Sequence, residues 1–254
     1  MKCLIFFLAL LPALQPAAAA ERTMLRFCSI DIDFAPISRV DGTGHYQFLL
    51  MQAASKAGID VERRIAPRRR CLDEMRAGVK DGMVAAYAPE RASFAVFPMA
   101  GDGPDVTKSF GTVRYYAYRR RNAAVSWNGS RFENLGAGSS VGVESAFVFV
   151  MDRLRGLGVD YDDGSKTLEQ NMAKLVAGRV DAVIGMDLEA DRLVKERFPG
   201  LVERAGPPFD VTPMYLMVSR QFFAKHPDAA QRMWQAVEDV RNSPAYKRYQ
   251  QLNP

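Results

Sequence analysis

The sequence is poor in the residues that build metal centres and pairs of nucleophile and base. It has two histidines, three cysteines and two tryptophans among 254 residues. Structural zinc sites use four clustered cysteine and histidine ligands, so neither a metal nor any other cofactor is expected. Histidine is the most common general acid or base, and His45 is expected in a loop near Gly44, while His226 precedes a proline. These absences argue against an enzyme.

Long apolar runs are missing after the first twenty residues. Met1 and Lys2 precede an apolar segment over 3–14, and a small-residue run ends at Ala20. This order is typical of a secretory signal peptide, and the apolar segment is shorter than the roughly 20 residues that span a bilayer. We expect residues 1–20 to be removed and the remaining chain to be released as a soluble protein into the periplasm.

Neither sign of charge dominates the chain. Lysine and arginine number 34 against 29 aspartates and glutamates, which gives a formal net charge of +5 without a long basic tail. Nucleic-acid binding rests on clustered lysines and arginines that neutralise phosphates, so no nucleic-acid partner is expected. The length that remains after the signal peptide suffices for two small lobes.

One structural unit occurs twice in the sequence. The run Ala77–Ala85 returns about a hundred residues later as Ala177–Gly185. In both copies an apolar-periodic segment reaches a glycine, which allows the left-handed residue that ends many helices. A short apolar segment follows, as in a buried parallel strand. Ligands of open α/β sheets bind outside the carboxyl ends of the strands, so the loops Tyr87–Arg91 and Met186–Glu189 are candidate facing binding loops.

Hydrophobic periodicity and turn residues divide the rest of the chain into alternating strands and helices. The first part predicts strands over 25–30, 61–66 and 94–97, helices over 46–57 and 71–77, and a mobile loop over 100–109. The second part predicts strands over 141–143 and 182–185 and helices over 147–157, 168–177, 188–197 and 228–242. Two aromatic or apolar strands, 112–119 and 211–218, are expected to cross between the lobes.

The order of these features resembles a known family. A first strand with a proline-bearing aromatic loop over 31–36, the repeated helix–Gly-x-x-Asp–strand unit, the turn Pro89-Glu90-Arg91 and two crossing strands are similar to the family 3 periplasmic solute-binding proteins. These are the amino-acid-type receptors of ABC importers. The resemblance extends over residues 24–251 and implies an α/β, two-lobed type 2 periplasmic-binding fold with a cleft between the lobes. It places lobe 1 at 21–112 plus 214–254 and lobe 2 at 113–213.

The resemblance also implies a set of ligand contacts. By position, Arg91 matches the arginine that clamps a ligand carboxylate in these receptors, and Asp187 is the nearest match to the aspartate that holds a ligand ammonium. Backbone N–H groups at the start of a helix around Glu144, Ser145 and Ala146 are expected to face the carboxylate.

Each of these residues also has a purely structural interpretation. Arg91 suits bidentate carboxylate binding, but it could instead form a surface salt bridge with Glu90 or with a neighbour in a helix. Asp187 could cap a helix that begins at Leu188. Glu144 could cap its own helix.

Two segments depart from the family pattern. The loop before Arg91 offers Tyr87 where hydroxyl residues are usual, and Arg68, Arg69 and Arg70 replace the usual tryptophan. Cations at a helix start oppose the helix dipole by a few tenths of a kcal/mol each, which favours an anionic partner for Arg68, although three solvated side chains are the alternative. Phe34 and Tyr87 could stack on a ligand or pack against the edge of the lobe.

Cys28 and Cys71 form the even pair that remains after signal-peptide removal. An even pair in an oxidising compartment is usually bridged. In the fold that the resemblance implies, both cysteines follow the ends of neighbouring strands, and this implies a disulfide between them.

The expected function is therefore that of a non-enzymatic, monomeric periplasmic receptor for a small carboxylate-bearing, amino-acid-like solute. Its implied partner is an ABC permease in the membrane. Two alternatives stay open. One is an accessory or sensory protein that uses the same fold to bind another protein, and the other is a secreted dehydratase-like enzyme on this scaffold.

Overall fold

The computed structural model describes residues 22–145 and 147–253. The expected signal peptide and Ala146 lie outside the described residues. None of the helices in this part of the chain is long and apolar enough to cross a membrane.

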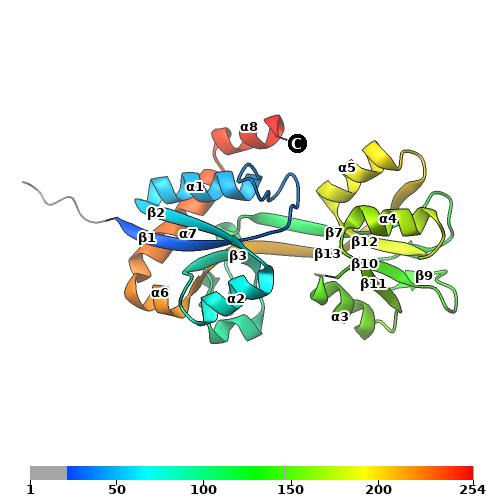
Figure 1. Cartoon of the computed structure of the whole chain (residues 1–254), viewed down its shortest axis with the longest axis horizontal. Coiled ribbons are helices and arrows are strands. Elements are labelled where there is room, and N and C mark those ends of the chain that lie inside the picture. The colour runs from blue at the N-terminus through cyan, green and yellow to red at the C-terminus, as the bar shows by residue number, and fades with distance from the viewer. Residues whose placement is uncertain (1–21, 146, 254) are drawn as a thin grey trace, which may run out of the picture.

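Two long antiparallel strands connect the halves of the molecule (Figure 1). They are β7 (Gly111–Arg120) and β13 (Val202–Ser219), and they pair with each other along almost the whole length of β7. Both crossing strands were predicted, but β13 starts at Val202 rather than at residue 211. The register shifts around Pro208, because a proline cannot donate a hydrogen bond to the neighbouring strand. This irregular half of β13 also lacks the alternation of apolar and polar residues that would have indicated a strand.

The first lobe contains parallel strands joined to β13. Its strand order is β13-β3-β1-β2, with β1, β2 and β3 parallel and β13 antiparallel to β3. Its elements are β1 (Thr23–Ile30), α1 (His45–Ala57), β2 (Ile59–Ala66), α2 (Arg68–Arg76), β3 (Gly82–Ala86), β4 (Ala95–Val96), α6 (Arg220–Lys225), α7 (Pro227–Arg241) and α8 (Pro244–Leu252). Helices α1 and α7 pack on one face through a core around Leu49 and Trp234, and α2 packs on the other through Met75.

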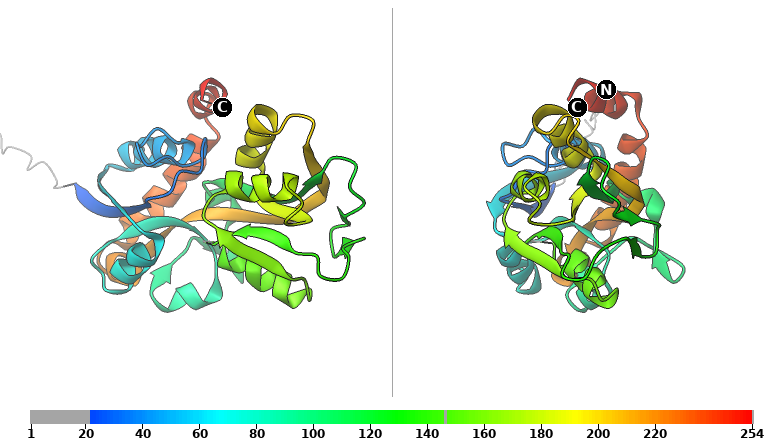
Figure 2. Two further views of the ribbon diagram at one scale, coloured as in Figure 1. Left: turned by 45° about the vertical axis from the view of Figure 1, so that its right-hand side comes forward. Right: turned by 90° about the vertical axis from the view of Figure 1, so that its right-hand side faces the viewer.

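The second lobe repeats the arrangement around β7. Its strand order is β11-β10-β12-β7, and β10 is parallel to both neighbours. Its elements are β10 (Val141–Glu144), α3 (Val148–Gly156), β11 (Tyr161–Ser165), α4 (Leu168–Val176), β12 (Ala182–Met186) and α5 (Asp187–Arg197). Helix α3 covers one face, and α4 and α5 cover the other. The turned view in Figure 2 shows β13 passing from one lobe into the other.

Short elements complete the chain. They are the 3₁₀ helices η1 (Pro89–Ser93) and η2 (Val106–Lys108) and the strands β5 (Met99–Ala100), β6 (Gly103–Pro104), β8 (Ser126–Trp127) and β9 (Phe132–Glu133). The sequence did not indicate α6 or α8. Helix α8 begins at Pro244 after Ser243, whose hydroxyl accepts from the Tyr246 N–H, a combination that starts a helix.

The internal repeat is confirmed. The two copies are the end of α2 with β3 and the end of α4 with β12, and each helix ends before a left-handed glycine, Gly78 with φ 68° and Gly178 with φ 73°. The aspartate of each copy donates its backbone N–H to the first strand of its lobe or next to it. Asp81 donates to the carbonyl of Arg26 in β1 at 2.8 Å, and Asp181 donates to the carbonyl of Ser140, just before β10, at 2.9 Å.

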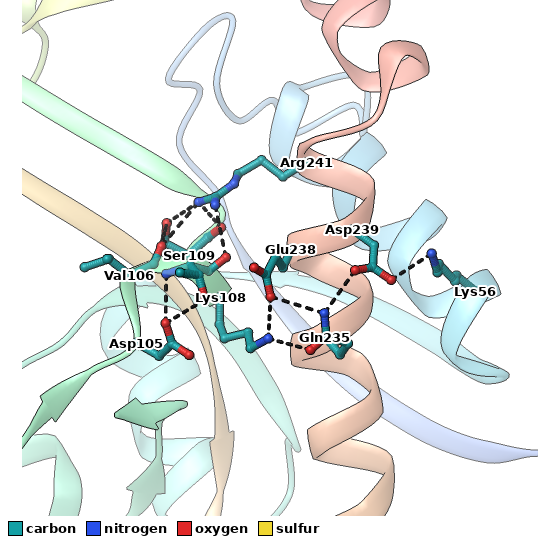
Figure 3. A network of polar contacts seen from close by, with 10 residues as sticks. Lys56, Asp105, Val106, Lys108, Ser109, Gln235, Glu238, Asp239 and Arg241 are labelled. Carbon is teal, nitrogen blue, oxygen red and sulfur yellow. Dashed lines mark hydrogen bonds and ion pairs between the residues drawn. The ribbon is translucent and has the colours of Figure 1, made fainter. Parts of the chain in front are cut away.

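The glycine- and aspartate-rich segment 100–109, predicted as a mobile loop, is tied to α7. Arg241 donates to the Ser109 carbonyl at 2.9 Å and the Thr107 carbonyl at 3.0 Å, and Lys108 bonds to Glu238 and to Gln235 (Figure 3). Loop composition alone could not reveal these partners, because they lie more than a hundred residues later in the chain.

Arg241→Ala should loosen this segment. The change removes the guanidinium that donates to two backbone carbonyls, and a hydrogen bond to a charged group contributes about 1.5–3 kcal/mol. Hydrogen exchange at residues 105–110 should accelerate in the variant, whereas Arg248→Ala, an exposed residue of α8, should leave it unchanged. Equal exchange in both variants would contradict the assigned role.

Cys28 and Cys71 are joined, as predicted, with their Cα atoms 5.7 Å apart. The predicted reason was partly wrong, because Cys28 lies within β1 rather than beyond its end and Cys71 lies one turn into α2. That helix begins at Arg68, directly after Pro67. The bond therefore clamps the first turns of α2 against the face of the sheet at β1.

Replacing both cysteines by serine should lower the free energy of unfolding by about 4 kcal/mol. The estimate follows from the chain entropy of a loop with sequence separation 43. Urea unfolding measures the difference, and reduced wild type is the matched control. Peptide mapping of unreduced protein that found free thiols at both positions would contradict the bond.

Candidate functional site

A cavity of about 80 Å³ lies between the lobes. Its walls come from the end of β1, the following loop, α1, α2 and β3 on one side, and from β7, β12, β13 and the start of α3 on the other. One water needs roughly 10–15 Å³ of such space, so the cavity has room for a small solute. Most wall residues are apolar, and they include Ile30, Met83, Val113 and Met186.

Phe34, a predicted site residue, lines this cavity. It sits in the loop after β1, where the backbones of Phe34 and Ser38 exchange hydrogen bonds of 2.8 and 3.0 Å. Its ring lies 6.0 Å from that of Phe147, and only 8% of the residue is exposed. Because Phe34 belongs to lobe 1 but packs in the hydrophobic cluster of lobe 2, it joins the lobes in this arrangement.

Arg68, also predicted, is the first residue of α2 and lines the same cavity. Its Nε atom is buried without a hydrogen-bond partner. No carboxylate of the described residues pairs with it, and loss of hydration on burial lowers its pKa below the ordinary value. Arg68 is half-buried, and a partly desolvated cation without a carboxylate partner is costly, which distinguishes it from the solvated alternative.

Arg91 lies close to Arg68 but does not belong to the cavity wall. It is half-buried in η1, and its Nη1 donates to the Ala86 carbonyl at 2.5 Å. Burial first, and then the positive charge of Arg68, lower its pKa. The salt bridge to Glu90 that sequence reasoning left open is not among the ion pairs of the described residues. Lobe 1 therefore holds two neighbouring guanidinium groups without a carboxylate partner.

Tyr87 takes the packing role rather than a place on the wall. Its ring meets that of Phe97 edge-on, with centroids 5.3 Å apart, against the cluster around the disulfide.

The predicted N–H groups of lobe 2 are arranged differently from expectation. Glu144 ends β10, and α3 begins at Val148, so Glu144 neither opens nor caps that helix. The Ser145 N–H donates to the Ser165 carbonyl at 3.1 Å and is therefore occupied. Ala146 lies outside the described residues.

Asp187 lies near the cavity and is engaged in its own helix. It is the first residue of α5, and its Oδ1 accepts from the Leu188 N–H at 2.9 Å. Its charge is one of the causes that raise the pKa values of Tyr46 and Tyr115, both wall residues, after the larger effect of burial.

Sequence reasoning missed several wall residues. Ser29 has a buried Oγ without a partner, and Tyr115 packs its ring 5.6 Å from Phe147. Their positions in the sequence could have identified them as site residues, because Ser29 follows Cys28 in β1 and Tyr115 lies in β7, the strand with alternating aromatic residues.

Two carboxyl groups of lobe 2 influence each other: Glu144 is buried and Glu189 is half-buried. Burial, and next the charge of Glu189, raise the pKa of Glu144 to about 8, and burial raises that of Glu189 to about 7. Glu144 Oε1 and Glu189 Oε2 have no hydrogen-bond partner. At neutral pH Glu144 is therefore mostly protonated.

Glu144→Gln should stabilise the protein selectively at high pH. A carboxyl group whose pKa is raised in the folded state stabilises the fold fully below its unfolded pKa of about 4.5. This contribution to the free energy of unfolding is lost as the pH rises towards 8. The amide keeps the neutral form at every pH, so we expect equal stabilities near pH 4 and a gain on the order of 2–4 kcal/mol near pH 9. Urea unfolding across this range is the measurement. The exposed Glu90→Gln should show no such divergence, and parallel curves for Glu144→Gln would contradict the burial argument.

The sequence matches no protein-family model and no curated protein. Solved structures do match. A histidine kinase sensor domain with similarity to periplasmic binding proteins superimposes with a TM-score of 0.66 at 15% identity, covering 91% of this chain and 96% of that one. An ancestral arginine-binding protein bound to arginine gives 0.65 at 20% identity, with 91% and 98% covered. The glutamate-bound GluR0 ligand-binding core from Nostoc punctiforme gives 0.65 at 12% identity, with 91% and 98% covered.

These similar structures are binding proteins and sensor domains rather than enzymes. At such identities the likeness establishes the fold. The chain has the two-lobed α/β fold of periplasmic-binding-protein-like domains, as the sequence predicted.

Proposed function

We propose that the chain is a periplasmic receptor that closes its two lobes around a small carboxylate-bearing solute. The observation that carries the proposal is the cavity between the lobes, into which lobe 1 presents the unpaired guanidinium of Arg68. Arg91 lies beside it, also without a carboxylate partner among the described residues. Two such cations favour an anion, and guanidinium binds carboxylates through strong charge-assisted hydrogen bonds.

Closure would be a hinge motion about the middle of β7 and β13. We propose that residues 21–112 plus 214–254 move as one body and residues 113–213 as the other. Support comes from the pairing pattern, in which β13 bonds to β3 of lobe 1 over Met214–Val218 while β7 bonds to β12 of lobe 2 over Tyr115–Arg119.

Delivery of the bound solute to an ABC importer by a monomeric, exported chain is the leading role within this proposal. A sensory role is the second candidate, because a sensor domain is among the similar structures. A deletion strain separates the two: loss of solute uptake supports transport, and loss of a solute-dependent transcriptional response with intact uptake supports sensing.

Ligand screening by thermal shift tests the receptor function itself. The panel contains amino acids, dicarboxylates, polyamines and aromatic monocarboxylates, and a ligand at 100 times its dissociation constant should stabilise the protein by about 2.7 kcal/mol. Small-angle scattering should then show a smaller radius of gyration with ligand.

Arg91→Ala should weaken carboxylate binding at least tenfold and lower the melting temperature of the empty protein only slightly, because the change breaks one hydrogen bond, to the Ala86 carbonyl, and no ion pair of the described residues. A panel without any stabilising ligand would contradict the receptor function and favour a protein-binding accessory role. A large drop in the melting temperature of the empty variant would indicate a structural role for Arg91.

A further inference from the structure

We propose that the solute is a small carboxylic acid with an apolar, ring-bearing body and no ammonium group, and that Arg68 is its carboxylate contact. This inference rests on the proposed receptor function and narrows its ligand from amino-acid-like solutes to one class. Four features of the cavity lead to it.

The first feature is the position of Arg68 in an otherwise uncharged wall. Its Nε is buried and unpartnered, and it is the only charged side chain among the described residues that line the cavity. Arg68 is half-buried, and a cation with a desolvated, unpartnered Nε is stabilised when a bound anion pairs with it. The empty cavity therefore has one strong preference, for a single negative charge at this point.

The second feature is a hydroxyl group on the same wall. Ser29 is 6% exposed, and its Oγ has no hydrogen-bond partner. Ser29 lies near the carboxyl end of β1 and Arg68 at the start of α2, and both residues line the cavity. A carboxylate has two oxygens and can accept from the guanidinium and from the hydroxyl.

The third feature is the apolar character of the remaining wall. Phe34, Tyr115 and Phe147 form an aromatic group. The ring centroid of Phe147 lies 6.0 Å from that of Phe34 and 5.6 Å from that of Tyr115. Met83 and Met186 face the same space, and methionine adapts well to aromatic surfaces. A ring-bearing body would lose contact with water against these side chains, which is favourable.

The fourth feature is the lack of a partner for an ammonium group. No aspartate or glutamate belongs to the described cavity wall. Asp187 lies near it but accepts from the Leu188 N–H, and Glu144 is mostly neutral because its pKa is raised to about 8. The ammonium group of a bound α-amino acid would therefore find no carboxylate on this mostly apolar wall, which is unfavourable.

Isothermal titration calorimetry on the exported chain tests the inference with matched ligands. The acids are phenylacetate, 3-phenylpropionate and benzoate, and L-phenylalanine and L-arginine are the amino acids. We expect at least one aromatic acid to bind, with a dissociation constant at least tenfold lower than that of either amino acid. Asp187→Asn should leave this binding unchanged, since an ammonium partner is not needed.

Substitution at the helix start identifies the contact. Arg68→Met should raise the dissociation constant of the acid at least tenfold, while Arg69→Met, the exposed neighbour in the same turn, should not change it. The melting temperature of empty Arg68→Met should be equal to or above that of wild type, because the change removes an unpaired, half-buried charge. This outcome separates a ligand contact from a structural role.

Three results would overturn the inference. Amino acids that bind as tightly as the aromatic acids would refute the ligand class while leaving the receptor function intact. Acid binding that survives Arg68→Met would refute the contact. Failure of every acid and every amino acid to bind would remove both the inference and the receptor function.

Discussion

The antiparallel pairing of β7 with β13 is the constraint on which the rest of the structure depends. Each strand continues into a different lobe, so the two lobe sheets form one hydrogen-bonded series from β11 to β2. The cavity lies against this pair, because Val113, Tyr115 and Met214 come from the crossing strands themselves. A relative rotation of the lobes must therefore be absorbed in the same strands that form the floor of the site.

The two lobes place residues of opposite charge type near the cavity, but only those of lobe 1 are fully ionised. Lobe 1 presents Arg68 and Arg91, which stay cationic although burial lowers both pKa values. Lobe 2 places Glu144 and Glu189 nearby, but burial favours their neutral forms. The net field in the gap is thus more positive than a count of charged residues indicates, and this bias favours anions over zwitterions.

Periodicity predicted nearly all of the long elements, because apolar spacing directly reflects which face is buried. The internal repeat indicated two lobes, and the resemblance to a known family implied the two-lobed fold. The site was predicted less completely. Phe34 and Arg68 lie on the cavity wall, whereas Tyr87 packs elsewhere and the start of α3 is shifted to Val148. Such details depend on contacts between distant segments, such as Phe34 with Phe147, which no local pattern encodes.

The disulfide has a consequence that reaches beyond the stability of the fold. The first turn of α2 carries three arginines, whose charges oppose the helix dipole and favour fraying of that turn. The Cys28–Cys71 bond holds the next residues of the helix against β1, and Arg68 is fixed one turn away. The geometry of the cavity wall at Arg68 is thus tied to the oxidation state of two thiols, so that a chain kept in a reducing compartment would carry the same residues with a less ordered arginine.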